Sequence, residues 1–109
     1  MAAREQRSEP RKDLCVTVTV FPAGESPIVA TSTNVSAHGM DLSSAIELRP
    51  ATRCEVEFAL PVDDQMRPLR LQACVVRSSV LSGEFSLGLV FFGMPERTQQ
   101  LLELFICTS

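Results

Sequence analysis

The chain has 109 residues, of which 45% are hydrophobic and 21% charged, and its formal net charge is −3. This length and balance predict one folded domain and exclude an intrinsically disordered chain. The acidic charge also argues against a protein that coats DNA, RNA or an anionic membrane. Phe is the only aromatic residue type, with 6 copies, so a groove that stacks the bases of single strands is not expected.

No segment of the sequence predicts export or membrane insertion. The first 13 residues are polar and charged and lack the apolar stretch of a signal peptide. No window approaches the roughly 18 apolar residues that a membrane span needs. The 4 cysteines are isolated along the chain, which is typical of free thiols in a reducing compartment. We therefore expect a cytoplasmic protein without a membrane span.

Charge is distributed unevenly between the start of the chain and the rest. Residues 1–13 carry a net charge of +1, whereas residues 14–109 carry −4. Pro10 disfavours a helical conformation at Glu9, so the basic segment is not expected to be a rigid helix. We predict that residues 1–13 are a flexible N-terminal arm and that residues 14–109 are the folded body.

Apolar residues at alternate positions predict a succession of strands in the body. The first series starts at Leu14, and a run of β-branched and small residues follows over residues 28–33. Three later series are separated by a polar connection over residues 61–68 and by a turn at Ser82-Gly83. The residues expected to point inward are Leu14, Val16, Val18 and Val20, then Cys54, Val56, Phe58 and Leu60, then Leu69, Leu71, Ala73 and Val75, and finally Phe85, Leu87, Leu89 and Phe91. Short strands with turns between them predict an antiparallel sandwich or small barrel.

Only the C-terminal segment has a helical pattern. Pro95 suits the first turn of a helix, Glu96 is favourable beside the positive end of the helix dipole, and the apolar residues between 101 and 106 recur at helical spacing. Such a helix could cover one mouth or one face of the barrel.

Metal, thiol and hydrolytic chemistry find little support in residue spacing. The cysteines are Cys15, Cys54, Cys74 and Cys107, without the closely spaced pairs from which zinc sites draw their ligands. Ser36, His38 and Asp41 are close in sequence, but a catalytic triad is defined by geometry, and their spacing on a turn gives no line from nucleophile to base to orienting group. We expect no metal, no cofactor and no enzymatic activity.

Two motifs carry a more specific prediction. Arg7 and Arg11 form an R-x-x-x-R motif on the arm, just before the first predicted strand. Residues 34–39 read Asn-Val-Ser-Ala-His-Gly, a [DN]-x-S-x-x-G motif, at a turn after the second predicted strand. Together with the strand order and the terminal helix, this pair of motifs resembles the PilZ domain family, bacterial receptors for the second messenger cyclic di-GMP.

The resemblance covers nearly the whole chain. It implies an all-β fold, a six- or seven-stranded antiparallel β-barrel with a C-terminal α-helix and a flexible N-terminal arm. Residues 87–91 are similar to the closing strand of the family, and residues 99–106 to its helix. Asn34 stands where the family more often has Asp. The chain also has Pro50-Ala51-Thr52 where family members often carry Gly, a departure that affects a turn rather than the pocket.

The resemblance also implies a set of ligand-binding residues. These are Arg7, Arg11, Asn34, Ser36 and Gly39, with Arg4 and His38 as peripheral candidates. The Arg fork matches the O6 and N7 acceptors of guanine and can also stack on the base or pair with phosphate. Asn34 can offer its amide to a guanine edge, and Ser36 supplies a hydroxyl next to the bound ring. Gly39 permits a positive φ or a close backbone approach where the turn meets the ligand.

These expectations give two functional hypotheses. In the first, the chain is a stand-alone cyclic di-GMP receptor whose arm orders on binding and changes the surface offered to a partner protein. The resemblance implies that the controlled process is motility, biofilm or exopolysaccharide output. No DNA or RNA partner is expected. The alternative is a ligand-independent PilZ-like adaptor, as in type IV pilus assembly, although such proteins typically lack both motifs. Gln6 precedes Arg7 where family members can carry another Arg, so the choice between one and two ligands per site stays open.

Overall fold

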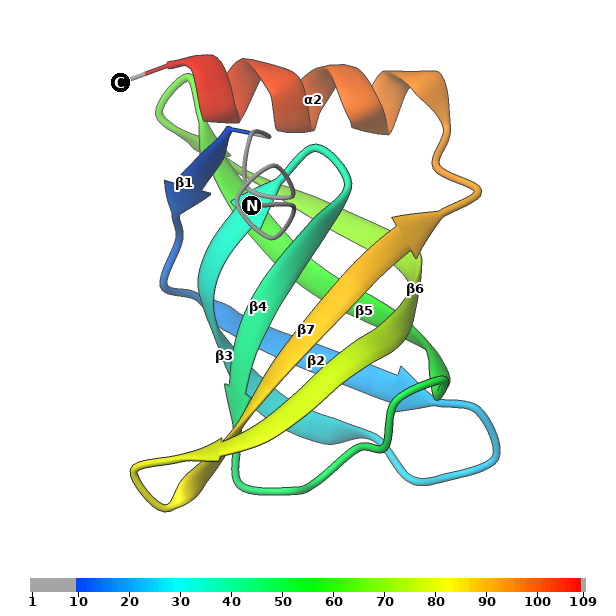
Figure 1. The fold of residues 1–109 in the computed structure, drawn as a ribbon. Coiled ribbons are helices and arrows are strands. Elements are labelled where there is room, and N and C mark those ends of the chain that lie inside the picture. The colour runs from blue at the N-terminus through cyan, green and yellow to red at the C-terminus, as the bar shows by residue number, and fades with distance from the viewer. Residues whose placement is uncertain (1–9, 109) are drawn as a thin grey trace, which may run out of the picture.

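A computed structural model describes residues 10–108 of the chain as a strongly twisted β-barrel with one helix lying across an open end (Figure 1). The elements are β1 (Arg11–Asp13), β2 (Thr17–Pro22), β3 (Ile28–Ser36), β4 (Gly39–Ser44), β5 (Arg53–Val62), β6 (Gln65–Leu81), β7 (Glu84–Phe92) and α2 (Glu96–Cys107).

The strands form one antiparallel sheet in the order β1-β3-β2-β5-β6-β7-β4. An additional pairing between β3 and β4 closes the six strands β2 to β7 into a barrel, and β1 adds to β3 from outside. This confirms the predicted antiparallel β-barrel with a C-terminal helix. Strand β1 consists of the last three residues of the predicted arm. The earlier part of that arm, including Arg4 and Arg7, lies outside the described residues.

The core lies inside the barrel and under the helix. The alternation predicted for the strands is observed, because nearly all the residues expected to point inward are buried, with Val16 and Phe85 partly buried at the margin. Leu102 and Phe105 of α2 are also buried, so the helix covers the mouth of the barrel as the sequence suggested. Burial of this apolar surface is the main stabilising contribution to the fold.

Two segments differ from the expectation. Strand β4 was not predicted, because its six residues directly follow a turn and give too short an alternating pattern. The polar connection expected over residues 61–68 is wrong: β5 and β6 continue to a two-residue turn at Asp63 and Asp64, which have φ angles of 53° and 62°. Such turns match the twist of a hairpin, and Asp tolerates this conformation. Residues 65–68 are all exposed, so this part of β6 shows no alternation.

Candidate functional site

Arg11, the second arginine of the arm motif, meets the [DN]-x-S-x-x-G motif on the outer face of the barrel. Strand β1 pairs with the end of β3, which sets Arg11 opposite Ser36 and Asp13 opposite Asn34. From this position Nη1 of Arg11 donates a hydrogen bond to Oδ1 of Asn34. Residues that are 23 positions apart in the sequence are therefore in direct contact. The β1–β3 pairing is what brings the arm to the [DN]-x-S-x-x-G motif.

The carboxylate of Asp41 joins this pair to a second arginine. Nδ2 of Asn34 donates to Oδ2 of Asp41 at 3.1 Å, and Nη1 of Arg11 lies 3.8 Å from the same oxygen. Arg77, from β6, donates through Nη2 to Oδ1 of Asp41 at 3.1 Å. Because the Asp41 side chain is only 14% exposed, two guanidinium groups and one amide surround a carboxylate that is largely shielded from water.

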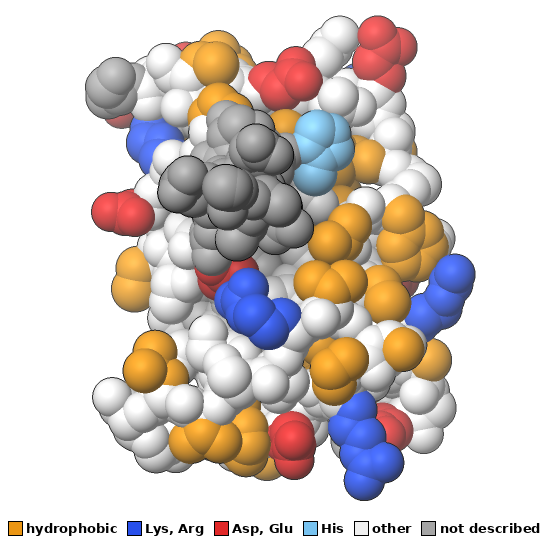
Figure 2. Space-filling view, in the orientation of Figure 1, with side chains coloured by type: hydrophobic (Ala, Val, Ile, Leu, Met, Phe, Trp, Pro, Cys, Tyr) orange, Lys and Arg blue, Asp and Glu red, His pale blue; other side chains and the backbone are white. Residues whose placement is uncertain are grey.

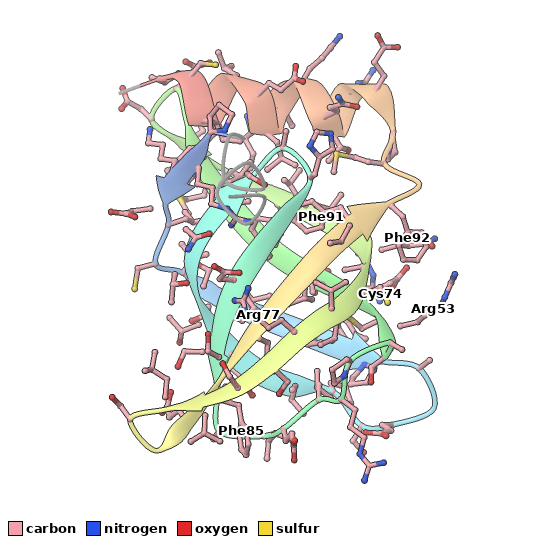
Figure 3. All side chains as sticks on the ribbon, in the orientation of Figure 1. Arg53, Cys74, Arg77, Phe85, Phe91 and Phe92 are labelled. Carbon is pink, nitrogen blue, oxygen red and sulfur yellow. The ribbon has the colours of Figure 1, made fainter. Side chains whose placement is uncertain are left out.

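Figures 2 and 3 show where this cluster lies. In Figure 3, Arg77 lies in front of the neighbouring strands β4 and β7, in the middle of the viewed face. In Figure 2, a basic and an acidic side chain touch in this part of the face, and hydrophobic side chains gather beside them. The cluster is thus a polar centre on the barrel wall rather than a feature of a loop.

Apart from Arg11, which faces Ser36, the cluster lies along one row of residues that crosses five strands. In the register of the sheet, Asp13 faces Asn34, Asn34 faces Asp41, and Asp41 faces Gly88. On the other side of Gly88 the row ends at Arg77. Neighbouring residues of such a row interact across strands, so the sheet itself fixes the spacing of the cluster.

Two β-bulges turn the side chains of the row outward. The pairing of β3 with β4 shifts between Ser32 and Asn34, which leaves Thr33 as an extra residue. The pairing of β6 with β7 shifts between Val75 and Arg77, which leaves Val76 as an extra residue. On a regular strand, residues two positions apart point to the same face. Asn34 and Arg77 would then point into the core, like the buried Ser32 and Val75. Each bulge re-aims the following side chain toward Asp41.

Ser36 and Gly39 shape the turn between β3 and β4. The Ser36 side chain is completely buried; its Oγ donates to the carbonyl oxygen of Gly39 at 3.3 Å and accepts from the backbone N–H of His38 at 3.2 Å. Gly39 does not have the positive φ that we considered, and its close neighbour in the structure is β7: a Cβ there would lie 2.2 Å from the carbonyl oxygen of Leu89. Glycine is therefore required by the contact with β7.

His38 lies beside a surface hollow of about 320 Å³. The hollow lies between the β3–β4 turn and α2, at the point where the described part of the arm begins. It is lined by Pro10, Ala37, His38, Glu103, Ile106 and Cys107. Its volume is at the lower end of the range for small-molecule sites.

The cysteines do not form a centre of their own. Burial, with the neighbouring Cys74 as a second cause, raises the pKa of the Cys54 thiol to about 11. Cys54 therefore stays protonated near neutral pH and acts as a small core residue. Within residues 10–108, no three His, Cys, Asp or Glu side chains are grouped closely enough to hold a metal ion. No helix in this range has the length and apolar character needed to cross a membrane.

Sequence reasoning missed two members of the cluster, Asp41 and Arg77. Asp41 was considered only as part of a hydrolytic triad, and its carboxylate instead engages Asn34, Arg11 and Arg77. Arg77 belongs to no motif. Its place follows from the β6–β7 register and from the bulge at Val76, neither of which leaves a sign in the sequence.

Comparison with known proteins decides the family. The sequence model of the PilZ domain family matches residues 5–106, which include both motifs. The chain belongs to the PilZ domain family. A search of curated proteins gave no significant match to this PilZ domain.

Solved structures with the same fold include other PilZ domains. The inhibitor of motility MotI/DgrA of Bacillus subtilis superposes with a TM-score of 0.78 at 23% identity. The match covers 88% of this PilZ domain and 47% of MotI/DgrA, so this chain spans about half the length of that protein. The PilZ domain of YcgR from Escherichia coli, solved with cyclic di-GMP, gives 0.72 at 15% identity, covering 93% and 88% of the two chains. PlzA of Borreliella burgdorferi, also solved in complex with cyclic di-GMP, superposes with a TM-score of 0.69 at 14% identity. The match covers 96% of this chain and 43% of PlzA. Because all three identities are below 25%, these superpositions establish a shared fold and nothing more.

Proposed function

We propose that this PilZ domain is a non-catalytic receptor for cyclic di-GMP that regulates a partner protein. The observation that carries the proposal is the contact between Arg11 and Asn34, because it joins one arginine of the arm motif to the [DN]-x-S-x-x-G motif. Family membership and the cyclic di-GMP complexes of YcgR and PlzA support the choice of ligand.

The chemistry of the face suits this ligand. Cyclic di-GMP carries two guanines and two phosphates on a compact ring, and arginine can bond both the O6/N7 edge of guanine and a phosphate. The Arg11 side chain is 30% exposed, so a ligand can reach part of it. Asn34 lies beside it with an amide that can bond a guanine edge. Ser36 and Gly39 hold the turn on which Asn34 depends.

Arg7 completes the proposed site, and the proposed ordering of the arm on binding concerns the segment that contains it. That segment lies outside the described residues, whereas Arg11–Asp13 are already paired with β3. Ordering would change the surface next to α2 and so provide a signal to a partner protein. The motility inhibitor among the structural neighbours supports motility as one candidate process.

Isothermal titration calorimetry of the full chain with cyclic di-GMP tests the proposal. We expect saturable binding by the wild type, and a loss of about tenfold to a hundredfold in affinity for Arg11→Ala or Arg7→Ala, since a good arginine–guanine contact contributes about 1–3 kcal/mol. Arg70→Ala is the matched control, because Arg70 is an exposed β6 arginine paired with Glu55 and Glu57.

Two results would overturn the proposal in different ways. If the Arg7→Ala, Arg11→Ala double variant binds like the wild type, the site is elsewhere. If the wild type shows no binding of cyclic di-GMP at ligand concentrations up to the millimolar range, the receptor function is wrong. A stable protein partner found without the ligand would then favour the adaptor hypothesis.

A further inference from the structure

We infer that a second hollow on the barrel wall is the docking surface for a partner protein, and that it takes an acidic side chain of the partner together with a neighbouring apolar one. The hollow has a volume of about 310 Å³ and is lined by residues of β2, β5, β6 and β7. The inference rests on the proposed function in one respect, because it names the surface that a regulated partner would contact, but its test does not need cyclic di-GMP.

A row of residues across four strands forms part of the lining. In the register of the sheet, Phe21 faces Glu55, Glu55 faces Gln72, and Gln72 faces Phe92. The two phenylalanines are partly buried and lie at opposite ends of the row, with two polar side chains between them. The hollow thus offers apolar contact at its ends and hydrogen bonds in the middle. It has room for about ten water molecules, which is enough for one or two side chains.

Arg53 is held at one end of this row. It reaches from β5 across β6, and its guanidinium lies 4.8 Å from the centre of the Phe92 ring on β7. Figure 3 shows these two side chains together with Cys74 at one side of the barrel, well separated from Arg77 in the view. Within residues 10–108, no carboxylate forms an ion pair with Arg53. A guanidinium positioned by a ring loses little side-chain freedom when it binds a carboxylate.

The neighbouring charges determine which kind of group fits. Nε of Arg70 donates to Oε1 of Glu55 at 2.8 Å, and its Nη1 lies 3.4 Å from Oε2 of Glu57. Of the two charged groups that line the hollow, Glu55 is therefore already paired and Arg53 is not. Two carboxylates nearby disfavour a polyanion, whereas a single carboxylate can bond Arg53. An apolar side chain beside that carboxylate would pack on the Phe92 ring, and arginine and aromatic residues are enriched in protein interfaces.

The same two strands connect this hollow with the candidate site. Arg77 and Gly88 belong to the row of Asp41, and Gln72 and Phe92 lie further along β6 and β7. The strand from Gly88 to Phe92 is about 13 Å long. An interface of ordinary size, about 800 Å² on each protein, would span both places. A partner seated on the hollow would therefore also contact the face where we propose that the ligand binds.

Titration of the isotopically labelled full chain with blocked dipeptides, followed by NMR, tests the inference. The probes are the N-acetyl amides of Asp-Phe, Asn-Phe and Lys-Phe, which share the ring and differ in the charge beside it. We expect saturable shifts at Arg53, Gln72 and Phe92 with the Asp-Phe probe. The other two probes should bind about fivefold to tenfold more weakly, because they cannot form the charged hydrogen bond to Arg53.

A pair of arginine variants checks the role of Arg53. Arg53→Gln should weaken binding of the Asp-Phe probe about fivefold to tenfold, for the same reason. Arg67→Gln is the matched control, since Arg67 is an exposed arginine of β6 that does not line the hollow, and it should bind the probe like the wild type. Thermal melting identifies any loss of folding in the variants, and the comparison of the three probes on the wild type needs no variant.

The outcomes separate this inference from the proposed function. The docking surface is wrong if the Asp-Phe probe gives no saturable shifts at the hollow, if the three probes bind equally, or if Arg53→Gln binds the probe like the wild type. If these results occur while calorimetry shows binding of cyclic di-GMP, the receptor function stands without this surface. If the Asp-Phe probe binds as expected and cyclic di-GMP does not, the docking surface stands and the receptor function is wrong.

Discussion

Ala51 occupies a backbone conformation that suits glycine. Its φ angle is 76°, in the turn before β5, and its N–H donates to the carbonyl oxygen of Val75 at 2.7 Å. The left-handed conformation costs an L-residue roughly 1–2 kcal/mol because Cβ approaches the following carbonyl oxygen. This is also the turn where the sequence departs from the glycine common in the family, and the departure lies away from the Arg11–Asn34 contact.

Replacing Ala51 by glycine should stabilise the domain. We expect Ala51→Gly to raise the free energy of unfolding by about 0.5–1 kcal/mol, because the relief of strain exceeds the entropy that glycine adds to the unfolded chain. Urea unfolding followed by circular dichroism measures the change. Ala45→Gly is the matched control, since Ala45 is also an exposed loop residue but has no positive φ. A lower stability for Ala51→Gly would contradict this account of the turn.

At the scale of elements, the strand β1 is fastened to the helix by one side chain. Nζ of Lys12 donates to the carbonyl oxygens of Phe105 and Thr108 and lies 4.4 Å from the centre of the Phe105 ring. The last turn of α2 has no basic residue of its own, so β1 supplies the cation that its carbonyl groups and dipole favour. Arg11, the neighbouring residue, contacts Asn34, and β1 therefore links the candidate site to the helix.

Removing this cation should loosen the end of the helix. We expect Lys12→Met to cost about 1 kcal/mol of stability, as a helix-dipole contact and a cation–π contact together suggest, and to speed amide hydrogen exchange in the last turn of α2. Hydrogen exchange measured by mass spectrometry reports both the loss of stability and the faster exchange in the last turn of α2. Arg97→Met, in the first turn of the same helix, should be neutral or slightly stabilising, because a cation there opposes the dipole. Unchanged exchange in Lys12→Met would show that Lys12 does not hold the helix end.

The elements also show why the site was only partly predictable. Most strands and the helix could be predicted, because burial of alternate residues leaves a pattern in the sequence. Arg11 and Asn34 could be proposed because they belong to motifs. Asp41 and Arg77 could not, since their positions depend on two bulges and on the pairing of β4 and β6 with β7. A one-residue shift in register reverses which way a side chain points.

For the whole molecule, the net charge conceals the feature that matters for an anionic ligand. The chain is acidic overall, at −3, and this excludes a protein that tracks a long polyanion. Yet the sheet brings Arg11 and Arg77 to the single carboxylate of Asp41, and these three side chains together carry a charge of +1. A small ligand with two phosphates responds to this local charge rather than to the total.

The central claim is that cyclic di-GMP binds the face formed by β1, β3, β4, β7 and β6. Titration of the isotopically labelled full chain with cyclic di-GMP, followed by amide chemical shifts in NMR, tests it most directly. We predict saturable shifts concentrated at Arg11–Asp13, at residues 34–41, and around Arg77 and Gly88. Shifts confined to the pairs Arg53–Phe92 and Arg70–Phe21, which link β5 to β7 and β6 to β2, would contradict the claim, as would the absence of saturable shifts.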